Sequence, residues 1–161
     1  MRDDADYARL LAPLLTLATG YARSLLRNVH DAEDAVQQAA LRGFERFDTF
    51  DAARPFKGWW FAILRNYCID TIRRRQADNT CSLGDYDPPD QPRSERSDWE
   101  RLDDAIARLS ADHREILRLR YFADLSYLEM AETLRIPQGT VMSRLHLARK
   151  ALARLMNEEA V

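Results

Sequence analysis

The chain has 161 residues, a formal net charge of −2, and 46% hydrophobic against 31% charged residues. That composition excludes an intrinsically disordered chain and is typical of one or two small folded domains. The apolar runs are too short to span a bilayer and the acidic N-terminus lacks the features of a signal peptide, so we expect a cytoplasmic protein.

The charges are unevenly distributed. Residues 1–75 contain 12 Lys and Arg and 10 Asp and Glu, residues 76–98 contain 2 and 6, and residues 99–161 contain 10 and 10. The net charge therefore says little about partners. With only 5 glycines and no alternating strand pattern, the sequence favours helix. We expect an all-α fold with two small helical domains, a three-helix N-terminal unit and a four-helix C-terminal unit, joined by a flexible linker.

The N-terminal unit, residues 1–76, is predicted to hold helices at about 4–27, 31–47 and 55–75. Pro13 is expected to bend the first helix. The second begins with acids suited to a helix N-terminus, and the third begins near Pro55, a favourable first-turn residue. The expected core stripe of the second helix consists of Ala35, Val36, Ala39, Ala40, Gly43 and Phe44.

Residues 77–98 break every helical pattern. They hold three of the six prolines, Gly84 and six acids, with too few apolar residues for a packed face. We interpret this stretch as a solvated tether, although an acidic chain could also lie in a basic channel.

The C-terminal unit, residues 99–161, is predicted to hold helices at about 98–109, 111–122, 126–134 and 138–157. Ser126 and Glu129 form a capping box that starts the third of these, and Pro137 ends it. A short helix, a tight turn and a longer basic helix together indicate a helix-turn-helix.

The last helix has two faces. Its buried stripe is predicted to consist of Val141, Leu145, Ala148 and Leu152. The opposite face carries Gly139, Ser143, His146, Leu147 and Lys150, with Arg144 and Arg149 on the flanks. This layout suits a helix in the DNA major groove, with arginines that reach the phosphates. A merely solvated basic face is the alternative; the capped helix and proline turn before it favour DNA.

The segment LSYLEMAETLRIPQGTVMSRLHLARKAL, residues 125–152, resembles the promoter-reading helix-turn-helix of bacterial sigma factors. The segment DAEDAVQQAALRGFERFD resembles the polymerase-clamp helix of that family, and FKGWWFAILRNYCIDTIRRR resembles its promoter-opening helix. Two short domains joined by a linker resemble the extracytoplasmic-function (ECF) subgroup. The resemblance covers nearly the whole chain apart from the linker.

The resemblance implies a factor that binds core RNA polymerase, places its C-terminal domain on the −35 element, and opens the −10 element with its N-terminal domain. The expected −35 contacts are Gln138, Thr140, Met142, Ser143, Arg144, His146, Leu147, Arg149 and Lys150. The family frequently has arginine where this chain has Met142 and Leu147.

The polymerase contact is expected on the second helix. Helical spacing puts Asp31, Asp34 and Gln37 on one polar face, which could also be a solvated surface that compensates the helix dipole. The resemblance places Asp34 and Gln37 against a coiled coil of the largest polymerase subunit. Gln38 joins this set, at a position where the family often has Glu.

Eight of the fifteen aromatic residues fall in the window from Phe44 to Tyr67. Phe56, Trp60, Ile63 and Tyr67 share one helix face and are expected in the core. Other aromatics can stack on unpaired bases, and nearby arginines can hold phosphates. The resemblance makes 49–57 the loop that captures a flipped −10 base, although the residue that lines the pocket stays open. The expected −10 contacts are Thr49, Phe50, Lys57, Trp59, Arg65, Asn66, Arg73, Arg74 and Arg75.

No catalytic arrangement is recognisable in the sequence. It has no glycine-rich phosphate loop and no nucleophile–histidine pair with structural context. Cys68 and Cys81 are expected to be reduced thiols, and the three scattered histidines argue against a metal site. We therefore expect neither enzyme activity nor a cofactor.

Two other classes of protein compete with a sigma factor: a helix-turn-helix repressor that ignores polymerase, and a sigma-like decoy that binds a partner protein without DNA. Two DNA-facing domains and no obvious dimerisation helix count against the repressor. The basic last helix and the cluster Arg73–Arg75 count against the decoy. Family membership would also make an anti-sigma factor a plausible partner, one that clamps the two domains.

Overall fold

The computed structural model describes residues 4–79 and 97–159. Within those ranges every regular element is a helix, which confirms the all-α fold with two small domains. The predicted linker at 77–98 lies for the most part outside the described residues, as does Cys81. No described helix has both the length and the apolar character needed to cross a membrane.

The N-terminal domain begins with a broken helix rather than a continuous one. Helix α1 spans Asp4–Leu11, the 3-10 helix η1 spans Ala12–Leu14, and α2 spans Leu15–Leu26. Pro13 stands in the first turn of η1, where its missing N–H interrupts the α-helical hydrogen bonds. The expected bend is therefore a change of helix type.

Helices α3 (Val29–Arg46) and α4 (Phe56–Asn79) complete the domain, with a short 3-10 helix at Phe47–Thr49. The side chain of Asn28 accepts a hydrogen bond from the backbone N–H of Asp31, so α3 begins earlier than the acids alone indicated. Helix α4 continues past Arg75 to Asn79. The fully buried core of this domain includes Tyr21, Trp60, Phe61 and Leu64.

Gly43 on α3 leaves room for side chains of α1 and α4 to meet. A Cβ atom at this position would lie 2.4 Å from Tyr7 Oη and 3.0 Å from Trp60 Cδ1. In that space Trp60 Nε1 donates to Tyr7 Oη at 3.1 Å, and the tyrosine hydroxyl donates to the carbonyl of Ala40 at 2.7 Å. The buried polar atoms of this cluster are thus paired.

The C-terminal domain consists of α5 (Asp98–Arg108), α6 (Ala111–Tyr121), α7 (Tyr127–Leu134) and α8 (Gln138–Glu159). The capping box of Ser126 and Glu129 starts α7, and Arg135 in the left-handed conformation ends it. The turn into α8 closes the predicted helix-turn-helix. The core of the C-terminal domain includes Ile116, Leu119, Leu125, Met130, Val141 and Leu145, all almost fully buried.

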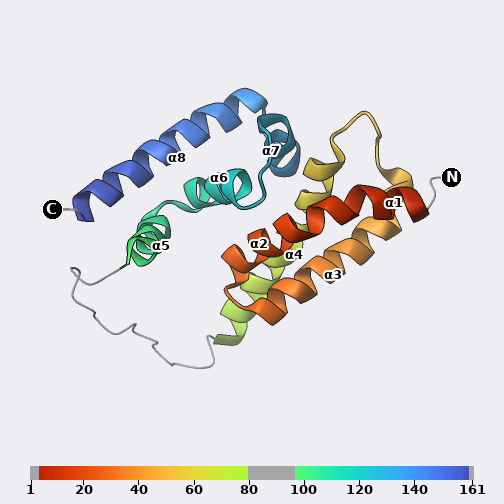
Figure 1. The fold of residues 1–161 in the computed structure, drawn as a ribbon, viewed down its shortest axis with the longest axis horizontal. Coiled ribbons are helices and arrows are strands. Elements are labelled where there is room, and N and C mark those ends of the chain that lie inside the picture. Colours follow the sequence, from red (N-terminus) through yellow and green to blue (C-terminus); the bar gives the residue numbers. More distant parts are fainter. Residues whose placement is uncertain (1–3, 80–96, 160–161) are drawn as a thin grey trace.

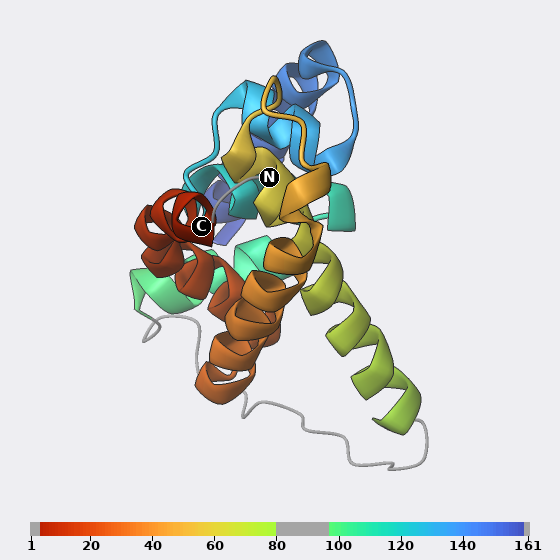
Figure 2. The same ribbon diagram turned by 90° about the vertical axis from the view of Figure 1, so that its right-hand side faces the viewer.

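The two domains pack against each other, mainly through α4 and α7 and also through α2 and α6 (Figure 1). We call this contact the domain interface. Thr133 on α7 is buried and donates its hydroxyl to the carbonyl of Gly58 on α4 at 2.9 Å. Figure 2 shows that the C-terminal domain lies over the beginning of α4, while the far end of α4 projects away from it.

Candidate nucleic-acid interface

Helix α8 presents the two faces that its sequence predicts. Val141, Leu145 and Ala148 are buried against the rest of the C-terminal domain, while Leu152 is half-buried. The opposite face is exposed and includes Gln138, Ser143, His146 and Lys150. Because this face is free of contacts with the protein core, it is available to a long partner such as a DNA groove.

Two apolar side chains interrupt the exposed face of α8. Met142 is 52% exposed and Leu147 is 53% exposed. Side chains of this kind can contact thymine methyl groups but add no attraction for phosphates. The face therefore carries fewer positive charges than its length allows.

The two flanking arginines are held by other helices. Arg149 Nε donates to Tyr121 Oη at 2.8 Å, and its guanidinium carbon lies 5.7 Å from the centre of that ring. Arg144 Nη2 lies 3.8 Å from Asp112 Oδ2. The predicted contact Thr140, near the start of α8, is half-buried. Sequence reasoning missed Tyr121, because nothing in α8 indicates which residue at the end of α6 will meet it.

The polar face of α3 is partly occupied by α4. Asp31 forms an ion pair with Arg75, and Asp34 Oδ2 accepts a hydrogen bond from Tyr67 Oη at 3.0 Å. Gln37 is exposed, and the predicted contact Gln38 is half-buried. Asp34 remains exposed despite its hydrogen bond, so Asp34 and Gln37 stay accessible together.

An apolar hollow continues this face toward the end of α3. It has a volume of about 440 Å³ and is lined by Tyr7, Gln37, Ala40, Leu41 and Phe44. Leu41 is 58% exposed and Phe44 is 47% exposed, so the expectation that Phe44 belongs to the core is wrong. The accessible face of α3 continues at helical spacing from Gln37 to Leu41 and Phe44. Sequence reasoning missed these two apolar residues as part of that face.

The predicted −10 contacts divide between covered and open positions. Lys57 Nζ donates to the carbonyl of Asp124 at 2.7 Å, and Arg65 forms an ion pair with Glu115 across the domain interface. Arg54 in the preceding loop makes a further ion pair at 2.5 Å with Glu132, which sequence reasoning did not anticipate. Three basic residues of the N-terminal domain thus face acceptors of the C-terminal domain.

The aromatic end of the loop is packed inward. Phe50 is buried and its ring centre lies 4.8 Å from that of the half-buried Trp59. Thr49 is exposed and donates its hydroxyl to the carbonyl of Arg46 at 2.8 Å.

The later part of α4 lies away from the C-terminal domain. Asn66, Arg73 and Arg74 are exposed there, and Asn66 Oδ1 accepts a hydrogen bond from Arg65 at 3.3 Å. Arg75, paired with Asp31, donates to the carbonyl of Leu26 at 3.2 Å. Trp60 and Ile63 are buried and Phe56 and Tyr67 half-buried, as their shared helix face predicts.

Among the described residues no group of His, Cys, Asp and Glu is placed to hold a metal ion. Burial raises the pKa of the Cys68 thiol to about 12, which leaves it protonated and unreactive at neutral pH. The pKa of the buried Tyr21 hydroxyl is likewise raised, chiefly by desolvation.

The fold thus combines a helix-turn-helix in one domain with an accessible polar face on α3 in the other. Two family models match the chain: "Sigma-70 region 2" over residues 10–77 and "Sigma-70, region 4" over residues 99–152.

Individual proteins agree with the family models. The chain is 36% identical to the ECF RNA polymerase sigma factor SigL of Mycobacterium tuberculosis over 147 residues, which covers 88% of this chain and 83% of SigL. It is 32% identical to the ECF RNA polymerase sigma factor SigW of Bacillus subtilis over 149 residues, with coverages of 83% and 80%. The solved structure of the sigma factor RpoE of Bartonella quintana, in complex with the anti-sigma factor NepR, superposes with a TM-score of 0.73 at 29% identity over 94% of this chain and 97% of that one.

The chain belongs to the ECF sigma factors. These proteins initiate transcription at specific promoters together with RNA polymerase, and they bind both the core enzyme and promoter DNA.

Proposed function

We propose that the chain reads the −35 element with α8, engages and opens the −10 element with α4 and the loop 49–57, and docks on the largest polymerase subunit through α3. It performs no chemistry itself and acts in the cytoplasm, where polymerase and promoters are found. The observation that carries the proposal is the exposed face of α8, which lies opposite the buried Val141, Leu145 and Ala148 in a helix-turn-helix.

The residues of α8 have separate tasks in this proposal. Ser143, His146 and Lys150 contact base edges, because they lie at the centre of the exposed face. Arg144 and Arg149 anchor phosphates from the flanks, and Tyr121 holds the guanidinium of Arg149 in place. Met142 and Leu147 supply apolar contacts, so the isolated C-terminal domain should bind DNA weakly.

The docking face of α3 combines charge with apolar surface. Asp34 and Gln37 provide the polar part, and Leu41 and Phe44 provide an exposed apolar edge beside them. Protein interfaces commonly combine apolar and polar side chains in this way.

Promoter binding requires the domains to separate. The −35 and −10 elements are about 25 base pairs apart, which is about 85 Å along B-DNA at 3.4 Å per base pair. In the packed arrangement Lys57 and Arg65 are engaged by the C-terminal domain, whereas phosphate contacts need them free. We therefore assign the packed arrangement to the free factor and an extended one to the factor on polymerase.

We also propose that an anti-sigma factor holds this chain in an inactive form. The support is the likeness to RpoE of Bartonella quintana, a sigma factor solved in complex with the anti-sigma factor NepR. Such a partner would keep the polymerase- and DNA-binding faces hidden.

The proposal is tested by footprinting with core polymerase. The full chain, mixed with core polymerase and promoter DNA, should protect both the −35 and −10 elements and make thymines near −10 sensitive to permanganate. The His146→Ala variant should change which −35 sequences are protected, and Arg154→Ala, on the same helix but outside the proposed contacts, should not. Protection by the chain alone, unchanged by polymerase, would indicate the repressor instead.

A further inference from the structure

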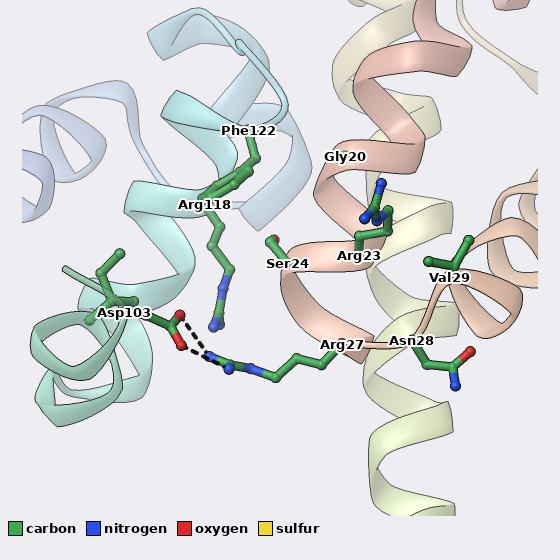
Figure 3. Close-up of a pocket in the computed structure, with 10 residues that line it drawn as sticks. Gly20, Arg23, Ser24, Arg27, Asn28, Val29, Asp103, Arg118 and Phe122 are labelled. Atoms are coloured by element: carbon green, nitrogen blue, oxygen red, sulfur yellow. Dashed lines mark hydrogen bonds and ion pairs between the residues drawn. The ribbon is translucent and has the colours of Figure 1, made fainter. Parts of the chain in front are cut away.

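A hollow of about 500 Å³ lies between the two domains. The N-terminal domain contributes α2 and the start of α3, and the C-terminal domain contributes α5 and α6 (Figure 3). Its volume is in the range of small-molecule sites, roughly 300–1,000 Å³.

The hollow is lined by three arginines and one acid. Arg27 donates from both terminal nitrogens to the two carboxylate oxygens of Asp103, each at 2.9 Å. This ion pair joins the two domains and uses both oxygens of the only carboxylate in the lining. Arg23 and Arg118 make no side-chain hydrogen bond within the described part of the chain.

The positive charge of Arg118 is poorly compensated. Figure 3 shows its side chain pointing from α6 toward the Arg27–Asp103 pair, so two guanidinium groups converge on one carboxylate. Burial is the largest effect that lowers the pKa of Arg118 and the guanidinium of Arg114 is the next, while Asp103 raises this pKa. An anion placed beside Arg118 would add to the compensation that Asp103 provides.

The remaining lining is largely apolar. Phe122, 44% exposed, and Ile106 lie on the C-terminal side, and Val29 lies on the N-terminal side. Gly20 leaves open space on α2, because a Cβ atom there would meet nothing within 4 Å. Phe122 borders the same hollow as the guanidinium groups, near the end of the Arg118 side chain that is away from its guanidinium (Figure 3), so an aromatic surface and anion donors line one space.

We propose that this hollow binds a small phosphorylated ligand of mononucleotide size. Its phosphates lie against Arg118, Arg27 and Arg23, since guanidinium groups bind phosphate oxygens in pairs. Its planar group rests on Phe122.

The site has a regulatory consequence that rests on the proposed function. The ligand touches both domains, so it binds the packed arrangement and not the separated one. At a free concentration ten times its dissociation constant, it would reduce the population of separated domains about elevenfold. Binding would thus oppose the opening that promoter recognition requires.

Isothermal titration calorimetry on the full chain tests the site directly, with ADP, pyrophosphate and adenosine as probes. ADP should bind saturably at one site, pyrophosphate more weakly, and adenosine not at all. Arg118→Gln and Arg23→Gln should each weaken ADP binding about tenfold or more, the usual effect of losing a charged hydrogen bond. Arg154→Gln removes an arginine on α8 away from the hollow and should leave ADP binding unchanged.

Arg23 is exposed, so its variant reports on the site even if the half-buried Arg118 is needed for folding. Absence of saturable binding by ADP and pyrophosphate would overturn the proposal, and so would equal losses in the Arg23 and Arg154 variants. An acidic peptide that binds through Arg23 and Arg118 while ADP does not would reassign the hollow to a protein partner. None of these results depends on transcription, so they leave the sigma-factor function as a separate question.

Discussion

Replacing Gly58 by alanine would place a methyl group against the backbone of α7. The added Cβ atom would lie 2.7 Å from the carbonyl oxygen of Glu129, 2.9 Å from Glu132 Cβ and 3.1 Å from Glu129 Cα. Two of these three atoms belong to the backbone, in a helix fixed by its capping box, so a small side-chain rotation does not relieve the contact. The buried hydrogen bond from Thr133 to the carbonyl of Gly58 would be stretched as well.

The cost falls on the packed arrangement alone. Overpacking a well-packed contact typically costs about 1–3 kcal/mol, which corresponds to a 5- to 150-fold change in an equilibrium constant. Within the N-terminal domain the same substitution is favourable or neutral, since alanine has the higher helix propensity. Gly58→Ala should therefore shift the free chain toward separated domains without unfolding either one.

Small-angle X-ray scattering measures this shift. A compact chain of this length has a radius of gyration of about 15 Å, and separation of the domains should raise the value measured for Gly58→Ala above that of the parent. Gly20→Ala is the matched control, because it makes the same chemical change in α2 with nothing within 4 Å of the new atom. Identical scattering from the parent and both variants would refute the account of the domain interface.

The accessible face of α3, the exposed face of α8 and the buried thiol of Cys68 give further predictions. Asp34→Lys should weaken co-purification with core polymerase, whereas Glu33→Lys, a change at the adjacent exposed residue, should not. The Asp34 variant also loses one hydrogen bond, which should lower the free energy of unfolding measured in urea by about 1 kcal/mol. Equal binding by both variants would contradict the assigned face of α3. Arg149→Ala should weaken binding about equally on all DNA sequences and reduce the slope of log affinity against log salt by about one. Leu147→Arg should tighten binding and shift the selected −35 sequences toward guanine, and an unchanged selection would mean that Leu147 does not face bases. The pKa of Cys68 is raised from 9.0 to about 12 by burial, so the unfolded chain loses this proton first and the free energy of unfolding should fall as the pH rises from about 9 to 12. Urea titrations that give constant stability over that window would contradict the buried environment of the thiol.

Local signals in the sequence were sufficient for the helix-turn-helix. The capping box at Ser126 and the proline at 137 set the bounds of α7 to within one residue, because both act on the backbone beside them. The alternation of buried and exposed positions along α8 followed from helical geometry alone. The same reasoning failed at Phe44, which lies on the accessible face of α3 with Gln37 and Leu41, although Gly43 and Phe47 beside it are buried.

The domain interface could not be predicted in the same way. Gly58 and Thr133 are 75 positions apart, and neither breaks a local pattern in its own helix. The partners of Arg54 and Arg65 depend on how two separately folded units meet, which helical periodicity does not encode. For this reason the sequence identified Lys57 and Arg65 as basic residues for DNA but gave no sign that acceptors of the C-terminal domain cover them.

Transcription in vitro tests the central claim most directly. The full chain and core RNA polymerase would be incubated on supercoiled genomic DNA of the source organism, and the 5′ ends of the transcripts would be sequenced. The account predicts transcripts that depend on the chain, start at defined sites and share a −35 and a −10 sequence upstream. Transcripts that do not change when the chain is added, whether or not it leaves a footprint on DNA, would contradict it.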